Sequence, residues 1–271
     1  MTRPTTAKRT GCQGCMNGVA APVFTMAFQP IVDVVTNATY AYEALVRPLN
    51  GGGAIDVLSQ VTDDNRYTFD QACRVKAINL ASQLGMQSLL SINFLPNAVY
   101  QLAACIQLTL ESAARVNFPL QHIIFEVTES EPTRDPDHLA AIFKEYKRHG
   151  MLTAIDDFGA GHSGLNLLAQ FQPDIVKIDM ALTRNIHTDR VKRVITRSIL
   201  MMCADLGISV VAEGIECAEE AIALRELGVR LFQGYFFARP AVEQLPVVSL
   251  ELIGQLERQL ETALLASSAH T

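Results

Sequence analysis

The chain has 271 residues, of which 49% are hydrophobic and 18% charged, so a sizeable core is available and global disorder is excluded. Its formal net charge of −6 argues against a general surface for a nucleic-acid polymer. It allows one anionic ligand, because bound cations can reverse the local field. No stretch approaches the ~18 apolar residues of a membrane span or resembles a secretory signal, so we expect a cytoplasmic protein that binds no membrane.

Residues 1–22 are rich in Thr, Gly and Pro and predict a flexible tail. The tail contains one C-x-x-C pair, Cys12 and Cys15, with no second pair nearby. An incidental pair, a redox switch and half of an intermolecular metal site all fit this spacing. The other cysteines stand singly in apolar segments, which is typical of reduced core thiols in a cytosolic protein.

From residue 23 onward, short apolar runs alternate with helical stretches. The first two runs, joined by the polar VTNAT, predict an antiparallel hairpin, whereas the later runs alternate with helices and predict parallel strands. About eight such strands predict a TIM-type barrel that departs from the standard one at its hairpin, or a doubly wound open sheet. The runs are FQPIVDVV, YAYEALV, SLLSINF, HIIFEVTE, LTAIDDF, DIVKID, SVVAEGIE and RLFQGYFF.

Three stretches carry helix signals. Asp135 followed by Pro136 is typical of a helix start. Residues 189–206 place apolar side chains three and four positions apart, as on one face of a helix. The last predicted helix, 249–265, does the same, and its face could pack on the barrel or bind a partner; residues 266–271 are expected to be disordered. The apolar residues of these two faces are Val191, Val194, Ile195, Ile199 and Met202, and Ile253, Leu256, Leu260 and Leu264.

Polar side chains gather where the predicted strands end. In an α/β barrel these ends face one mouth, so the side chains should converge there. Several carboxylates in one mouth cannot stay ionised without cations, and oxygen donors favour Mg²⁺, Mn²⁺ or Ca²⁺ over zinc. The polar residues are Glu43, Arg47, Asn93, Glu126, Glu129, Asp156, Asp157, Lys177, Asp179, Glu213, Glu216 and Gln233.

The adjacent Asp156 and Asp157 could reach two cations, one of them shared. Two hard cations about 3.5–4 Å apart are a recurring device of phosphoester hydrolysis. Lys177 fits a salt bridge or the orientation of an attacking water, and Arg47 fits a surface charge or a contact with a phosphate.

Together these motifs resemble the EAL domain, the cyclic di-GMP-specific phosphodiesterase module of bacterial signalling. The resemblance covers roughly residues 23–248, within a predicted domain of 23–265. It implies a modified TIM (β/α)8 barrel with an antiparallel first strand, two Mg²⁺ or Mn²⁺ ions, inhibition by Ca²⁺, and hydrolysis of cyclic di-GMP to linear pGpG. The motifs, in family order, are FQPI (28–31), EALVR (43–47), SIN (91–93), FEVTE (125–129), DDFGAG (156–161), KID (177–179), AEGIE (212–216) and QGYFFARP (233–240).

The resemblance also implies residue roles by position. Asp156 would bridge the cations, with Asp157 on the second, and Lys177 would contact the attacking water. The implied metal ligands are Glu43, Asn93, Glu126, Asp156, Asp157 and Glu213, and the implied catalytic residues are Glu43, Lys177 and Glu213. The implied substrate contacts are Gln29, Leu45, Arg47, Asp179, Gln233 and Pro240. Glu216, Cys12 and Cys15 are further candidates.

The glycine-rich loop after Asp157 resembles a family segment that reaches a dimer interface and controls metal occupancy. This implies a homodimer through the loop and the adjacent helix, with Glu129 anchoring the loop and Gly159, Gly161 and His162 regulating it. We read His162 as a structural variant rather than a catalytic base. The departures from the family pattern are Ala160, His162, Gly164 and Arg230, and none of them is an implied metal ligand.

The complete acidic set with Lys177 predicts an active phosphodiesterase. Two alternatives are a non-catalytic cyclic di-GMP receptor that acts through a protein partner, and a TIM-barrel metal phosphoesterase with another substrate. No separate sensory domain is expected in the remaining residues. Any control is therefore expected to act through the tail, the dimer or an unidentified regulatory protein.

Overall fold

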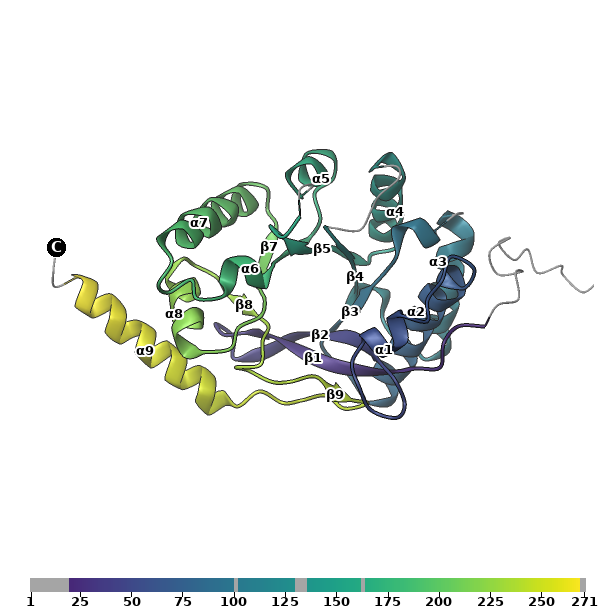
Figure 1. The fold of residues 1–271 in the computed structure, drawn as a ribbon, viewed down its shortest axis with the longest axis horizontal. Helices are drawn as coiled ribbons and strands as arrows, with labels where there is room; N and C mark the ends of the chain where they lie inside the picture. The colour runs from purple at the N-terminus through teal and green to yellow at the C-terminus, as the bar shows by residue number, and fades with distance from the viewer. Residues whose placement is uncertain (1–19, 100–101, 130–135, 162–163, 269–271) are drawn as a thin grey trace, which may run out of the picture.

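The computed structural model describes residues 20–99, 102–129, 136–161 and 164–268, in which a closed ring of strands is surrounded by helices (Figure 1). Strand β1 pairs with β2 on one side and with β8 on the other, which closes the ring. The predicted modified TIM barrel is therefore confirmed, and the open doubly wound sheet is wrong. The C-x-x-C pair, Cys12 and Cys15, lies outside the described residues.

The strands are β1 Thr25–Asp33, β2 Ala38–Arg47, β3 Leu89–Asn93, β4 Ile123–Thr128, β5 Leu152–Phe158, β6 Ile175–Ile178, β7 Ser209–Ala212, β8 Leu231–Phe232 and β9 Ala241–Val242. The α-helices are α1 Ile55–Leu58, α2 Arg66–Gln83, α3 Leu102–Arg115, α4 Pro136–Arg148, α5 Gly164–Gln170, α6 Met180–Thr183, α7 Arg190–Asp205, α8 Ala218–Glu226 and α9 Leu250–Ser268. Short 3₁₀ turns occupy η2 Pro96–Ala98 and η3 Leu120–His122.

The first strand runs against its neighbours, as the hairpin predicts. β1 pairs antiparallel with β2, β8 and β9, whereas the pairs from β2 to β8 around the ring are parallel. The hairpin turn ends at Asn37, whose φ of 56° lies in the left-handed region that Asn tolerates better than most residues. All parallel strands therefore end at the same mouth of the barrel.

The core has an outer part and an inner part. Outside the ring, strand side chains such as Phe28 and Phe125 pack with helix residues such as Phe143. Inside the ring, single apolar side chains from most strands meet in one layer, which we call the barrel floor. It consists of Ile31, Ala41, Ile124, Ala154, Ile175, Val211 and Leu231.

The last strands differ from the prediction. The run RLFQGYFF predicts one strand, but β8 covers only its second and third residues. Gly234 packs so closely on the backbone of Ile215 that an added Cβ would lie 2.1 Å from the Ile215 carbonyl oxygen. The chain therefore leaves the sheet here, and it returns as β9, which the sequence analysis did not predict.

The two predicted amphipathic helices are confirmed as α7 and α9. In α9, Ile253 and Leu256 are buried in the same core as Leu224 of α8. In α7, Ile199 is buried, but most of the predicted apolar stripe faces outward: Val191, Val194 and Ile195 are exposed. Pro136 begins α4 as predicted, while Asp135 lies outside the described residues.

Among the singly placed cysteines whose side chains the structure describes, two are buried as predicted, whereas Cys217 is free but only half-buried at the start of α8. Cys73 and Cys203 are free and buried, and burial raises the pKa of the Cys203 thiol to about 11. Among the helices that the structure describes, none has the length and hydropathy that a membrane span requires.

Arg230, a departure from the family pattern, lies at the start of β8 and forms a two-pronged ion pair with Asp33 of β1. Burial raises the pKa of Asp33, but hydrogen bonds from Arg230 and the Thr36 backbone outweigh it and hold this pKa at about 2. The ion pair therefore joins β1 to the start of β8 at the end of the barrel away from the mouth.

The ion pair between Asp33 and Arg230 makes the free energy of unfolding depend on pH. Because the folded pKa of Asp33 lies below its unfolded value, the unfolded chain binds more protons in between, so the pair stabilises fully above about pH 4 and loses its effect towards about pH 2. Arg230→Gln should lower the free energy of unfolding at about pH 6 and converge with wild type as the pH falls. Urea unfolding at several pH values measures this difference in the free energy of unfolding between Arg230→Gln and wild type. Arg193→Gln, which breaks a surface ion pair with Glu226, is the control. A difference that stays constant at all pH values would contradict the role of the Asp33–Arg230 pair.

Candidate functional site

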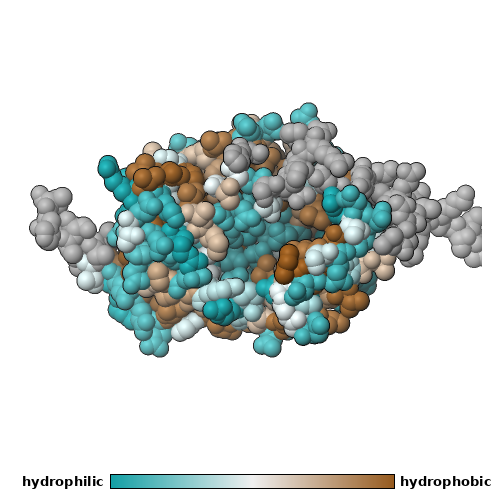
Figure 2. Space-filling model, viewed as in Figure 1, coloured by the Kyte–Doolittle hydropathy of each residue, from teal (hydrophilic) through white to brown (hydrophobic). Residues whose placement is uncertain are grey.

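A polar layer lies directly above the barrel floor. Alternate residues of a strand point to the same side, so the residue two positions nearer the mouth also faces the barrel interior. A hollow of hydrophilic residues occupies the centre of the face seen in Figure 2. Counting two positions from each floor residue gives Gln29, Glu43, Glu126, Asp156, Lys177, Glu213 and Gln233.

Lys177 is at the centre of this layer and is 1% exposed. Its Nζ lies 2.8 Å from Glu213 Oε1, 3.1 Å from both Glu126 Oε2 and Asp156 Oδ1, and 3.3 Å from Glu43 Oε2. Burial alone would lower the pKa of Lys177, but these carboxylates raise it well above its usual range. The ammonium therefore stays charged and neutralises part of the cluster.

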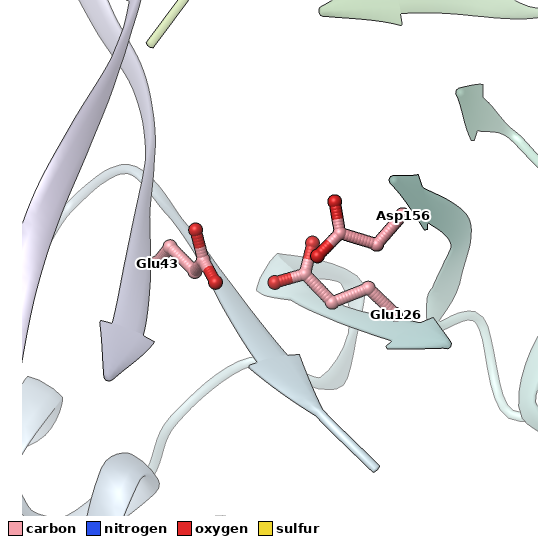
Figure 3. Close-up of side chains that lie close together, drawn as sticks. All are labelled: Glu43, Glu126 and Asp156. Carbon is pink, nitrogen blue, oxygen red and sulfur yellow. The ribbon is translucent and has the colours of Figure 1, made fainter. Parts of the chain in front are cut away.

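The carboxylates form two groups that could each hold a metal ion. Glu43, Glu126 and Asp156 point toward one another from β2, β4 and β5 (Figure 3), and their oxygens lie within 4.8 Å of one another. Asp156, Asp157 and Glu213 form a second group by the same measure. Asp156 belongs to both, as the predicted bridging role requires.

The electrostatics of the cluster fit divalent cations. Burial raises the pKa of Glu126 well above its usual range, and the nearby Glu43 and Asp156 add to the effect. Burial and the charge of Asp156 likewise raise the pKa of Glu213. Burial, Asp156 and Asp179 raise the pKa of Asp157 to about 6. One ammonium does not balance these acids, and oxygen donors at this spacing suit a hard cation.

A bulge explains how two adjacent aspartates share one site. In a regular strand, neighbours point to opposite sides, but the β5–β6 register shifts between Ile155 and Phe158. Asp157 there has a φ of 54°, a left-handed conformation that costs a residue with a Cβ about 1–2 kcal/mol. Its N–H donates to Asp156 Oδ1 at 2.9 Å. The bulge turns Asp157 toward the mouth beside Asp156.

Gln233 and Asn93 donate hydrogen bonds to Glu43, and Gln29 in turn contacts Gln233. Gln233 Nε2 donates to Glu43 Oε2 at 2.6 Å and approaches Gln29 Oε1 at 3.4 Å, while Gln29 Nε2 donates to the Ala238 carbonyl at 3.2 Å. Asn93 Nδ2 donates to Glu43 Oε1 at 2.9 Å and to Glu126 Oε1 at 3.3 Å. Asn93 thus presents its amide nitrogen to the acids. To bind a metal ion, its side-chain amide would have to rotate so that the oxygen takes the place of the nitrogen.

The family model of the EAL domain matches residues 16–240. The chain belongs to the EAL domain family. The match begins before the predicted domain boundary at residue 23, and α9 continues to Ser268, three residues beyond the predicted helix end at 265. The domain boundaries of 1–22, 23–265 and 266–271 stay predictions.

Three known proteins resemble this EAL domain closely. A crystal structure of a standalone versatile EAL protein from Vibrio cholerae O395, in its c-di-GMP bound form, is 53% identical with a TM-score of 0.83, covering 86% of this chain and 99% of that one. The blue light- and temperature-regulated antirepressor BluF of Escherichia coli K12 is 33% identical, over 82% of this chain and 56% of BluF. The probable cyclic di-GMP phosphodiesterase PdeD of the same organism is 30% identical, over 82% of this chain and 42% of PdeD. The chain thus spans about half the length of these two relatives.

The loop after Asp157 in this EAL domain is tied to Glu129. The carboxylate of Glu129 accepts N–H bonds from Gly159 at 2.8 Å, Gly161 at 3.2 Å and Gly164 at 2.7 Å. A Cβ at Gly161 or Gly164 would come within 3.0 Å of this carboxyl group, so the glycines permit the close approach. The geometry agrees with the predicted anchor, while His162 lies outside the described residues.

Two cavities open at the mouth of the EAL domain. One of about 320 Å³ is lined by four acids of the cluster together with Gln29, Asp179, Glu216, Gln233 and Tyr235; these acids are Glu43, Asp156, Asp157 and Glu213. A second of about 530 Å³ lies beside it and is lined by Leu45, Asn93, Asp70 and both aspartates of the bulge. Within the described residues, Arg47 and Pro240 line neither cavity; Arg47 Nη1 donates to the Val46 carbonyl at 2.7 Å.

Some residues at this site escaped the sequence analysis. Asp179 also caps α6 through its bond from the Ala181 N–H, and Glu216 pairs with Arg184 at 2.5 Å. Neither Arg184 nor Tyr235 was among the candidates. Tyr235 stands inside the QGYFFARP motif, so that motif could have indicated it, whereas Arg184 had no distinguishing signal.

Proposed function

We propose that this EAL domain hydrolyses cyclic di-GMP to linear pGpG with two divalent cations. The observation that carries the proposal is the bridging Asp156, shared by two carboxylate groups around the buried Lys177. The similarity to PdeD and to the c-di-GMP bound protein from Vibrio cholerae supports the substrate. Family membership alone does not decide activity, because it is the site that performs the reaction.

The cation-binding residues in this proposal are Glu43, Glu126 and Asp156 for one ion, and Asp156, Asp157 and Glu213 for the other. Asn93 is a further ligand of the first ion once its amide oxygen faces the acids. When bound, the cations supply Lewis-acid stabilisation of the phosphate and lower the pKa of water. Mg²⁺ and Mn²⁺ suit this donor set, and Ca²⁺, which prefers more ligands and longer bonds, is proposed to inhibit.

The other residues bind and orient. Lys177 is proposed to direct the attacking water, since its ammonium already lies within 3.3 Å of four carboxylates that surround the reaction site. Gln29, Asp179 and Gln233 line the smaller cavity and Leu45 the larger, so these surfaces are proposed to hold the nucleotide. The phosphate contact of Arg47 and the contacts of Pro240 and Glu216 stay predictions.

Turnover of cyclic di-GMP by the purified chain tests the proposal. We expect pGpG as the product, separated by chromatography, with Mg²⁺ or Mn²⁺ but with neither EDTA nor Ca²⁺. Other cyclic dinucleotides and a generic phosphodiester serve as controls for substrate choice. Metal-replete protein that binds cyclic di-GMP without hydrolysing it would refute the enzyme and favour a receptor. Faster turnover of another substrate would favour a different phosphoesterase.

The receptor alternative has one specific observation in its favour. A relative named an antirepressor, BluF, covers 82% of this chain, so the fold occurs in a protein named for regulation rather than hydrolysis. Its partner here would be an unidentified regulatory protein. The complete set of acids favours hydrolysis, because a receptor has no use for two cation sites.

A homodimer through the loop after Asp157 and α5 is part of the proposal. Leu165 of α5 is 66% exposed, and Val191, Val194 and Ile195 form an exposed apolar face on α7. Such faces are typical of protein interfaces. Light scattering should give a dimer for wild type and a monomer for Leu165→Asp, with Val247→Asp as an exposed control elsewhere; a wild type that stays monomeric contradicts the dimer. The cytoplasmic location and any redox role of Cys12 and Cys15 stay predictions.

A further inference from the structure

A buried ion pair lies on the helix side of the barrel wall, behind the acidic cluster. Arg74 and Asp70 are one turn apart on α2, with Nη2 and Oδ2 at 2.7 Å and side chains 0% and 1% exposed. Arg74 is among the largest fully buried side chains of the described chain. Transferring two charges from water into the protein interior is costly, and the attraction between the charges often does no more than offset that cost. Stability alone therefore gives little reason for the pair.

Among the described residues, three aromatic rings lie around the guanidinium of Arg74. Its Cζ lies 4.9 Å from the ring centre of Phe125, 5.6 Å from that of Phe94 and 5.8 Å from that of Tyr146. Arg74 Nη1 also lies 2.8 Å from the Tyr146 hydroxyl oxygen, which accepts its hydrogen bond. The planar guanidinium thus ties α2 to β4, to α4 and to the turn after β3.

Two of these rings adjoin residues of the site. Phe125 immediately precedes Glu126 on β4, and Phe94 immediately follows Asn93 at the end of β3. The backbone joins the same two strands, because the Phe94 N–H donates to the Glu126 carbonyl at 3.0 Å. Since neighbouring strand residues point to opposite sides, the rings face Arg74 while Glu126 faces the barrel interior.

Asp70 holds the same turn directly. Its Oδ1 accepts the N–H of Leu95 at 2.9 Å, two residues after Asn93, while its Oδ2 faces Arg74. Asp70 thus fixes the backbone where β3 ends, and Arg74 fixes the direction of the Asp70 carboxylate. Phe94, Leu95 and Phe125 thus connect the pair to Asn93 and Glu126 of the acidic cluster.

We propose that Arg74 and Asp70 are positioning residues that set where Asn93 and Glu126 stand in the first cation site. The inference rests on the cation site of the proposed function, which it deepens. Partners behind metal ligands typically change metal affinity by about 10–100-fold when they are removed. The pair is therefore expected to govern cation affinity more than folding.

The test replaces the pair with apolar side chains, Asp70→Leu with Arg74→Met, which removes both buried charges together. Such replacements are often neutral for stability, so the variant should melt close to wild type. It also removes the acceptor of the Leu95 N–H and the ring stacking. We expect the Kd for Mn²⁺, measured without nucleotide by electron paramagnetic resonance, to rise by about 10–100-fold. The control, Arg225→Met with Glu257→Leu, removes a remote ion pair and should leave this Kd unchanged.

A folded double variant with the wild-type Kd for Mn²⁺ overturns the inference. If the double variant does not fold, Arg74→Lys tests the inference instead. This substitution keeps the positive charge but removes the stacking of the planar guanidinium on the rings. A wild-type Kd for Mn²⁺ in Arg74→Lys again overturns the inference. Wild type that binds Mn²⁺ but does not hydrolyse cyclic di-GMP refutes the proposed function and leaves this measurement decisive. Wild type that binds no Mn²⁺ refutes both.

Discussion

Replacing Glu43 with alanine is expected to lower kcat for cyclic di-GMP by about 10³-fold or more, which corresponds to about 4 kcal/mol of lost transition-state stabilisation. Glu43 contributes to the first carboxylate group and contacts Lys177, Asn93 and Gln233 at once. Its loss removes a cation ligand and leaves those three polar groups without their shared acceptor. Steady-state turnover with saturating Mn²⁺ measures the effect.

Two further measurements make this result specific. Glu251→Ala removes an exposed glutamate of α9, far along the chain from the cluster, and should leave turnover unchanged. The Kd for Mn²⁺ should also rise in Glu43→Ala, because one of the two carboxylate groups then lacks a member. Retained turnover in folded Glu43→Ala would refute its role as a cation ligand.

Replacing Lys177 with methionine should abolish turnover and, in EDTA, destabilise the fold by about 3–5 kcal/mol. The substitution leaves four carboxylates without the ammonium that lies within 3.3 Å of each of them. Bound Mn²⁺ can neutralise the same acids, so it should restore most of the lost stability without restoring turnover. Urea unfolding with EDTA and with Mn²⁺ measures both parts.

The difference in stability between EDTA and Mn²⁺ tests whether Lys177 neutralises the carboxylates. Wild type should gain less stability from Mn²⁺ than Lys177→Met does, because its ammonium already balances part of the charge. Lys147→Met, which breaks a half-exposed pair with Asp174, is the control and should respond to Mn²⁺ as wild type does. A Lys177→Met protein as stable in EDTA as wild type would show that the cluster does not need the ammonium.

Much of this architecture could be predicted from the alternation of residues along each strand and from the position of polar residues at the strand ends. The hairpin, the parallel strands and the convergence of Glu43, Glu126, Asp156 and Glu213 follow from alternation along strands that end at one mouth. The adjacency of Asp156 and Asp157 predicted two cations. The bulge that turns both side chains to the same site is a change of backbone conformation, and no residue type in the sequence indicates it.

Other features depend on contacts between distant segments. Arg74 lies within a helix whose sequence gives no sign that a charged residue there is buried, since its three aromatic neighbours come from β4, α4 and the turn after β3. The short β8 depends on how closely Gly234 meets Ile215. The outward face of α7 has the apolar periodicity of a buried face, so the spacing of its residues alone did not show that Val191, Val194 and Ile195 are exposed.

Along each strand, one residue belongs to the apolar barrel floor and the residue two positions nearer the mouth belongs to the polar layer. Ile124 and Ala154 close the interior, and Glu126 and Asp156, two positions on, carry the charge. A substitution in the upper layer therefore alters chemistry while the packing below it remains intact. Single replacements of these acids are expected to remove the proposed hydrolysis and to leave a folded barrel with its mouth intact. A few replacements in the polar layer thus separate the proposed enzyme from a receptor built on the same barrel.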